Sequence, residues 1–214
     1  MTNLLHIDSS LRQEGSHSRD LARRYVEAWL AGGDDRTVTY RDLATNPPPL
    51  LNWDAYLAAT SPADGHTPAQ ATAWAQRLEL VTELEAADAL LVSAPMYNWA
   101  VPAELKAWID NVIVIGRTLQ PPDGGVLAGR PVTVLLAKGG GYSSGSPREA
   151  WDHLEPYLRL IFEALGAKPN IISTELTLAG VAPALDAFID LAAQSRADAE
   201  RAIDEHAKRE HVAA

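Results

Sequence analysis

The order of hydrophobic patterns along the chain predicts an α/β fold with a five-stranded parallel sheet. Short segments with the composition of buried strands alternate with amphipathic helical segments over the whole sequence, which is typical of a sheet covered by helices on both faces. The 214 residues contain no internal repeat and no linker-like stretch, so we expect one domain over residues 1–214. In a chain of this length the commonest order of five such strands is 2-1-3-4-5.

Five segments have the composition expected of strands. Residues 131–137 (PVTVLLA) are almost entirely apolar, as expected at the centre of a sheet, whereas residues 37–43 (TVTYRDL) alternate like an outer strand. The expected strands are residues 4–8, 37–43, 89–94, 131–137 and 170–176.

Apolar residues at helical spacing predict the helices between these strands. The first helix follows a serine-rich loop and ends at Gly32-Gly33, a short helix is expected near residues 53–59, another over residues 102–115, and a polar-faced one over residues 184–207. The apolar stripe of the first helix is Leu21, Ala22, Tyr25, Val26 and Trp29.

Two capping signals place further helix starts. Residues 67–70 (TPAQ) combine a capping box with proline at the first helical position, so a long helix is expected from there to about Ala87. Residues 146–149 (SPRE) have the same form and predict a helix that ends at Gly166. The apolar stripe of this second helix is Leu154, Leu158, Ile161, Phe162 and Leu165.

Composition excludes several classes of function. The sequence has no cysteine, which removes disulfides, thiol catalysis and cysteine-ligated metals, and His17, His66 and His153 have no metal-ligand spacing. The net charge of −10 opposes nucleic-acid binding, which needs clustered basic residues. The start, MTNLLHIDSS, lacks the features of a signal peptide, and no apolar run approaches the roughly 18 residues of a membrane span. We expect a cytoplasmic protein with no metal, nucleic-acid or membrane partner.

In parallel sheets a ligand binds beyond the carboxyl ends of the strands, where the strand order reverses. In the order 2-1-3-4-5 this point lies between the first and third strands. The adjacent loops are residues 9–18, 95–101 and, beside them, 138–146, which are also the loops with the least ordinary composition.

The loop over residues 9–18 is rich in hydroxyl groups. Ser16 or Ser18 can cap the first helix, whose free N–H groups form an anion site suited to a phosphate monoester. An ordinary N-cap is the simpler reading of this loop alone. Neither a G-x-G-x-x-G nor a P-loop motif is present.

The other two loops suit a planar ring. Met96, Tyr97 and Trp99 supply flat, polarisable surface, and Asn98 can reach a polar edge. The glycines after Lys138 let backbone N–H groups approach a ligand closely. Each loop taken singly also fits a structural role, but the three together describe a phosphate at one end and a ring system at the other, which is flavin mononucleotide (FMN).

The same segments carry a resemblance. SSLRQEGSHSRDL (residues 9–21), APMYNWAVPAELKAWID (residues 94–110) and AKGGGY (residues 137–142) resemble bacterial FMN-dependent NADH:quinone oxidoreductases, also called azoreductases, along nearly the whole chain. This resemblance implies a flavodoxin-like three-layer sandwich and two-electron ping-pong hydride transfer from NADH or NADPH to quinones or azo compounds. The flavin then performs the chemistry, and no catalytic residue beyond it is expected.

The resemblance also implies a set of cofactor-binding residues. The serine loop would hold the phosphate, residues 96–99 would line the ring system, and the glycine turn would meet its pyrimidine edge. The expected residues are Ser10, Ser16, His17, Ser18, Met96, Tyr97, Asn98, Trp99, Lys138, Gly139 and Gly140. The chain departs from the family at Ala137-Lys138, where serine and arginine are common, and at residues 119–122 (LQPP), so acceptor preference is not carried over.

The helix over residues 102–115 suggests a partner. Its last residues, 112–115 (VIVI), are apolar all round, and one core covers one face of a helix. We expect a second subunit on the remaining face, and the resemblance also implies a homodimer. The competing expectation is that residues 116–129 fold back over this helix.

Three other classes compete with this function. Residues 141–145 (GYSSG) match the G-x-S-x-G motif of serine hydrolases, with Asp186, Asp190, His206 and His211 downstream, but Lys138 and three glycines intervene after the strand. A phosphoacceptor domain needs an acidic cluster where Asp8 stands alone. A flavodoxin-type electron carrier would bind FMN without a nicotinamide.

Overall fold

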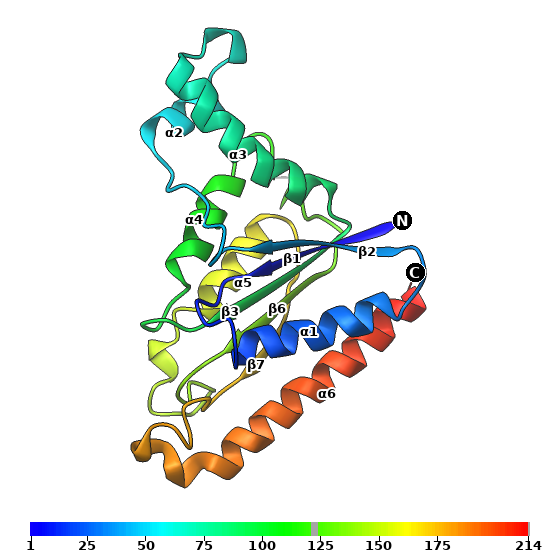
Figure 1. Ribbon diagram of the computed structural model, residues 1–214, viewed down its shortest axis with the longest axis vertical. Helices are drawn as coiled ribbons and strands as arrows, with labels where there is room; N and C mark the ends of the chain where they lie inside the picture. Colours follow the sequence, from blue (N-terminus) through cyan, green and yellow to red (C-terminus); the bar gives the residue numbers. More distant parts are fainter. Residues whose placement is uncertain (121–123, 214) are drawn as a thin grey trace.

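The computed structural model describes residues 1–120 and 124–213, and side chains up to residue 206. Its central sheet is parallel, with the strand order β2-β1-β3-β6-β7 (Figure 1). This is the predicted order, because two short strands of a separate ribbon occupy the fourth and fifth places in the chain. The sheet strands are β1 (Thr2–Asp8), β2 (Arg36–Asp42), β3 (Ala89–Pro95), β6 (Val132–Ala137) and β7 (Asn170–Thr174).

Helices cover both faces of this sheet, as predicted. In Figure 1, α1 and α6 run side by side on one face, and α3, α4 and α5 lie on the other. The helices are α1 (His17–Leu30), α2 (Trp53–Thr60), α3 (Pro68–Ala86), α4 (Ala103–Val112), α5 (Glu155–Ala164) and α6 (Ile189–Ala213). Short 3-10 helices lie at Ala63–Gly65, Glu149–Trp151 and Pro183–Phe188. In the part of the chain with described coordinates, no helix has the length and apolar character needed to cross a bilayer.

Alternating strand residues divide the core into two layers. On one face, Leu4 and Leu91 pack with Tyr25 of α1 and Ile203 of α6. On the other, Leu5, Ile7, Leu90 and Val92 pack with Leu84, Trp108 and Phe162 of the three opposite helices. Strands buried on both faces are the reason that β3 and β6 read as continuous apolar runs in the sequence.

The capping signals were predictive at one helix and wrong at another. Thr67 and Gln70 form the predicted capping box of α3. At residues 146–149 the Glu149 carboxylate instead accepts from the amide of Gly145 at 2.7 Å, and a short 3-10 turn follows. The α5 helix begins only at Glu155, because Asp152 Oδ1 accepts from the amides of Leu154 and Glu155.

The prediction of a helix to residue 115 was also wrong. The α4 helix ends at Val112, and the chain turns so that Val112 and Val114 are buried while Ile115 is exposed. The expected all-round apolar helix face therefore does not exist. Leu127, from the following connection, is buried in the same core layer as the α4 residues Leu105, Trp108 and Val112.

A buried arginine holds the end of α4. Arg77 of α3 is 3% exposed, and its guanidinium donates to the carbonyls of Asn111, Asp110, Ile113 and Ala55 at 2.5–3.3 Å. Burial lowers the pKa of Arg77 from its ordinary value. Three of these contacts satisfy carbonyl groups that the end of α4 leaves without helical partners, and the fourth ties α2 to the same guanidinium.

A two-stranded ribbon closes the connection after α4. The strands β4 (Leu119–Gln120) and β5 (Gly124–Gly125) pair antiparallel. Gly125 is enclosed by backbone, since a Cβ there would lie 2.5 Å from the carbonyl oxygen of Thr118. Of the departure from the family noted at residues 119–122, residues 121 and 122 lie outside the described residues.

Candidate functional site

The serine loop ends at the N-terminus of α1. Ser16 is the N-cap residue, and its hydroxyl accepts from the amide of Arg19 at 3.5 Å. The same hydroxyl lies 2.9 Å from Ser10 Oγ and 3.4 Å from Ser18 Oγ, so three hydroxyl groups converge at this helix end. Burial and the neighbouring Arg196 lower the pKa of His17, whose ring is therefore neutral at pH 7.

A buried polar network lies below this loop, at the carboxyl ends of β1, β2 and β3. Arg19 donates to Asp8 at 3.1 Å and, through both terminal nitrogens, to Asp42 at 2.8 and 3.0 Å. Tyr40 donates to Asp8 at 2.9 Å, and Ser93 also donates to Asp8. The network joins residues of three strands and one helix, so it forms only when the sheet has this order.

The pKa values of the network follow from burial and hydrogen bonding. Burial opposes ionisation of Asp8, but hydrogen bonds from His6, Ser93 and Tyr40 outweigh it and lower the pKa. Burial likewise opposes ionisation of Asp42, and the hydrogen bonds from Arg19 reverse the balance. Burial and the negative charge of Asp8 raise the pKa of Tyr40 to about 12. Both carboxylates are ionised at neutral pH, and the Tyr40 hydroxyl keeps its proton.

The aromatic loop is a tight turn with an uncommon backbone. Tyr97 and Ala100 exchange two backbone hydrogen bonds of 3.1 Å, and the two residues between them have positive φ, 48° at Asn98 and 67° at Trp99. Two consecutive left-handed residues are the geometry of a type I′ turn. Asparagine tolerates this conformation, but for a bulky residue such as tryptophan it is strained, and such strain gathers at functional sites.

The serine loop and the aromatic turn meet at the hydroxyl of Tyr97. It accepts from the amide of Leu11 at 3.1 Å and lies 3.5 Å from Ser10 Oγ. Trp99 lies at the outer side of the turn, 48% exposed, and its ring meets the edge of Trp151 at 5.8 Å. The sequence predicted that these two loops come together, and the structure brings them together.

The strand end that precedes the glycine loop is hydrogen-bonded to the start of the aromatic turn, and the segment before α5 is bonded to Trp99. The amide of Met96 donates to Ala137 at 2.8 Å, and the amide of His153 donates to Trp99 at 3.0 Å. The carbonyls of Gly139 and Gly140 accept from Leu178 and Leu176, whereas in the described parts of the chain no acceptor meets the amides of residues 139–141. A Cβ at Gly139 would lie 2.8 Å from Leu178, so a side chain here would displace its neighbour.

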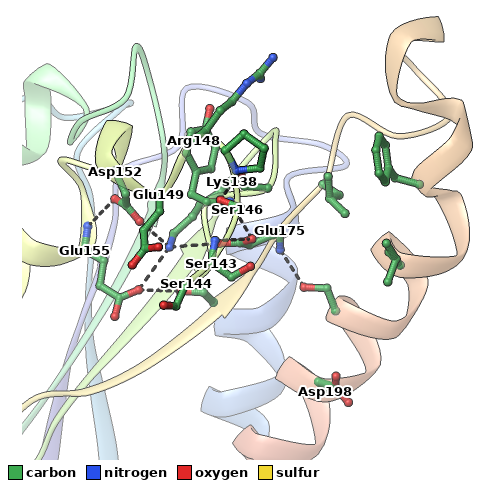
Figure 2. A pocket seen from close by; sticks show the side chains of 18 of the residues that line it. Lys138, Ser143, Ser144, Ser146, Arg148, Glu149, Asp152, Glu155, Glu175 and Asp198 are labelled. Carbon is green, nitrogen blue, oxygen red and sulfur yellow. Dashed lines mark hydrogen bonds and ion pairs between the residues drawn. The ribbon is translucent and has the colours of Figure 1, made fainter.

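Lys138 differs from the expectation based on the sequence. Its side chain is 3% exposed, and Nζ lies 2.6 Å from Asp152, 3.2 Å from Glu155 and 3.5 Å from Glu175 (Figure 2). Burial opposes the charge on Lys138, but Asp152 and the other carboxylates raise the pKa above its ordinary value. Glu175 also accepts from the amides of Tyr142 and Ser143, so this ion cluster fixes the course of the glycine loop.

Two cavities adjoin these loops. One, of about 830 Å³, is lined by Leu11, Tyr97 and Asn98 together with residues at the starts of α4 and α5. The other, of about 1130 Å³, opens beside Lys138 between the 141–149 loop, α5 and α6 (Figure 2). Of these two cavities, the smaller one is lined by residues of both the serine loop and the aromatic turn.

The serine hydrolase hypothesis finds no support in the geometry. Ser143 is exposed, and its amide donates to Glu175. His206 instead lies 3.1 Å from Thr133 Oγ1, in the opposite half of β6 from the glycine loop, and the side chain of His211 lies outside the described residues. No serine–histidine pair of the motif is formed among the described side chains.

The sequence did not predict the roles of Arg19, Tyr40 and Asp42. The signal available was weak: an arginine in the first turn of the helix and polar residues at the end of an outer strand. Asp8 was expected to be an isolated strand-end group, and it is the centre of a network.

Comparison with known proteins agrees with this geometry. A family model described as flavodoxin-like fold matches residues 2–207. The chain is 52% identical over 205 residues to an FMN-dependent NADH:quinone oxidoreductase of Frankia alni, covering 95% of this chain and 97% of that protein. It is 46% identical to a protein of the same description from Streptomyces avermitilis, covering 93% and 92%.

Solved structures show the same fold. An azoreductase of Bacillus anthracis str. Sterne superposes with a TM-score of 0.85 at 21% identity, covering 98% of this chain and all of that one. An FMN-dependent NADH-azoreductase of Bacillus anthracis str. Ames Ancestor, solved in complex with FMN, has a TM-score of 0.82 at 19% identity, with coverage of 98% and 100%. The fold is that of a flavodoxin-like protein. The chain belongs to the family of FMN-dependent NADH:quinone oxidoreductases.

Proposed function

We propose that this chain is an FMN-dependent NAD(P)H oxidoreductase that reduces quinones or azo compounds by two electrons. The observation that carries the proposal is the junction at Tyr97, where a hydroxyl-rich helix N-terminus adjoins a strained aromatic turn. The descriptions of the relatives named above support FMN as the cofactor and a quinone as the acceptor. The whole chain, residues 1–214, would act as one FMN-binding domain.

The described residues fit the two ends of the cofactor. Ser10, Ser16 and Ser18 offer hydroxyl groups, and the first amides of α1 offer N–H donors, for a phosphate that must be held in a protein of net charge −10. His17 adds a neutral ring with one N–H group beside this helix end. These donors bind an anion by hydrogen bonding more than by opposite charge.

The turn and the glycine loop fit the ring system. Met96, Tyr97, Asn98 and Trp99 would present apolar and aromatic surface to its face. The amides of Gly139 and Gly140 would donate to its polar edge, because they have no acceptor in the described protein. Lys138 would contribute through the loop that its carboxylate partners hold, since its ammonium is already surrounded.

FMN, when bound, supplies the two-electron chemistry between NAD(P)H and the acceptor. The chain's own residues would bind the flavin, orient it and tune its reduction. Donors at the polar edge of the ring favour the electron-rich reduced form, which is the task assigned to residues 139 and 140. Tyr97 positions ligands, because its hydroxyl is engaged by the serine loop.

The direct test is spectroscopic. Titration of the apoprotein with FMN is expected to give a saturable yellow complex, and NADH is expected to bleach it in the absence of oxygen. Asn98→Ala is expected to weaken FMN binding and slow turnover, with Asn46→Ala, an exposed asparagine that lines neither cavity, as the matched control. Absence of any FMN complex would refute the proposal, and hydrolysis of a chromogenic ester by colourless protein would favour the serine hydrolase instead.

We further propose a cytoplasmic homodimer. The support is an exposed apolar cluster, Leu50, Leu51, Trp53 and Tyr56, beside the exposed Ile115. Arg77 holds the α2 segment beside the end of α4, since its guanidinium donates to the carbonyls of both Ala55 and Ile113. Light scattering is expected to give twice the chain mass, and a monomer with FMN bound would contradict the proposal.

A further inference from the structure

The backbone of Arg19 belongs to the first turn of α1, and its guanidinium lies below the serine loop. The residue is 8% exposed. Its Nη2 donates to the carbonyl oxygen of Ser10 at 2.7 Å and to Asp42 at 2.8 Å. Its Nη1 donates to Asp8, Tyr40 and Asp42 at 3.0–3.1 Å. One planar group thus ties the serine loop to the carboxyl ends of β1 and β2.

Ser10 is held on its main chain and on its side chain. The contact with Arg19 fixes its carbonyl, while its hydroxyl accepts from Ser16 Oγ at 2.9 Å and from the amide of Arg12 at 3.3 Å. The hydroxyl of Ser10 is thereby placed among those of Ser16 and Ser18 and within 3.5 Å of Tyr97. Removing the hold on the carbonyl would free the loop to turn its hydroxyl away from the helix end.

The charge of Arg19 does not explain its presence. Asp8 and Asp42 are both ionised, so the buried network with Arg19 carries no net positive charge for a phosphate. The geometry of the guanidinium is the relevant property. A lysine ammonium keeps the charge but lacks the planar fork that reaches two strands and the loop at once.

We propose that Arg19 is a positioning residue that fixes Ser10 for recognition of the terminal phosphate of the cofactor. Tyr40 and Asp42 hold the guanidinium in place from β2. This inference rests on the proposed function, because it assumes that the serine loop binds the phosphate of FMN. It goes further in assigning selectivity for a phosphorylated flavin to a group that lies behind the loop.

The test compares FMN with riboflavin, which has the same ring system without the phosphate. Dissociation constants of both are measured for the wild type and for Arg19→Lys by quenching of flavin fluorescence. Arg19→Lys is expected to weaken FMN binding at least tenfold and riboflavin binding less than twofold, so the ratio of the two constants falls. If Arg19 served overall stability alone, the variant would bind both flavins more weakly by the same factor, and the ratio of the two dissociation constants would not change.

Two further variants keep the test decisive. Arg23→Lys, on the same helix but exposed and paired with Asp20 at the surface, is the matched control and is expected to leave the ratio unchanged. If Arg19→Lys does not fold, Tyr40→Phe removes one hydroxyl that contacts both Arg19 and Asp8, and a smaller fall in the ratio is expected. An unchanged ratio in the folded variant overturns this inference, whereas a wild type that binds neither flavin overturns the proposed function.

Discussion

The strained turn at Trp99 allows backbone conformation to be separated from ring binding. A left-handed conformation costs a residue with a side chain about 1–2 kcal/mol, and Trp99 has φ of 67°. In an ordinary position, replacing alanine by glycine costs about 0.5–1 kcal/mol because glycine has more freedom when unfolded. At position 99 the first quantity exceeds the second, so Trp99→Gly is expected to be more stable than Trp99→Ala by about 0.5–1 kcal/mol.

Both variants remove the indole ring, and they are expected to bind FMN equally weakly. The loss of one aromatic contact of about 1.4 kcal/mol corresponds to a tenfold higher dissociation constant. Stability is measured by urea unfolding of the apoprotein with far-ultraviolet circular dichroism, and affinity by flavin fluorescence. Ala75→Gly, on the exposed side of α3, is the matched control and should show the ordinary loss of about 0.5–1 kcal/mol.

Two outcomes would refute this reasoning. If Trp99→Ala proves the more stable of the pair, the turn does not strain its second residue. If both variants bind FMN like the wild type, the ring of Trp99 serves its edge contact with Trp151 and not the cofactor.

Two other predictions concern buried charges. Arg77→Met is expected to lower the free energy of unfolding by about 3–5 kcal/mol, because each buried carbonyl left without a donor costs about 1–3 kcal/mol. Urea unfolding measures this loss. The control is Arg117→Met, which breaks a half-exposed ion pair and should cost no more than about 1 kcal/mol. The lowered pKa values of Asp8 and Asp42 stabilise the fold fully above the unfolded value of about 4, and this contribution is lost as the pH falls through the lower folded values. Unfolding free energies measured from pH 7 down to pH 3 should therefore fall below about pH 4, and the slope should be smaller in Asp42→Asn; equal slopes would contradict the assignment.

Local patterns predicted the elements wherever neighbouring residues decide them. The capping box at Thr67 is satisfied by a residue three positions later, and the apolar run at residues 131–137 is itself the pattern of a strand buried on both faces, so α3 and β6 lie where they were expected. The capping signal at residues 146–149 was wrong because an alternative partner, the amide of Gly145, competes for the carboxylate of Glu149. Sequence pattern does not rank two local hydrogen bonds of similar strength.

The same limit applies to the site. Sequence reasoning located the three loops, because the carboxyl ends of parallel strands converge whatever their side chains are. It assigned Lys138 to the ligand, since the carboxylates that surround it come from positions 14, 17 and 37 residues later. Only the packed chain shows that three carboxylates surround its ammonium.

The sequence by itself determined the layered α/β fold and the chemical character of the loops, because hydrophobic period and turn composition are properties of adjacent residues. The strand order followed from the commonest arrangement for a chain of this length. Tertiary structure alone decided which polar groups meet: Arg19 below Ser10, Tyr97 against Leu11, and Arg77 at the end of α4. Each of these contacts joins separate segments, and its strength depends on burial and on donor–acceptor distance. Both quantities come into existence only when the sheet and its helices have closed around the residues.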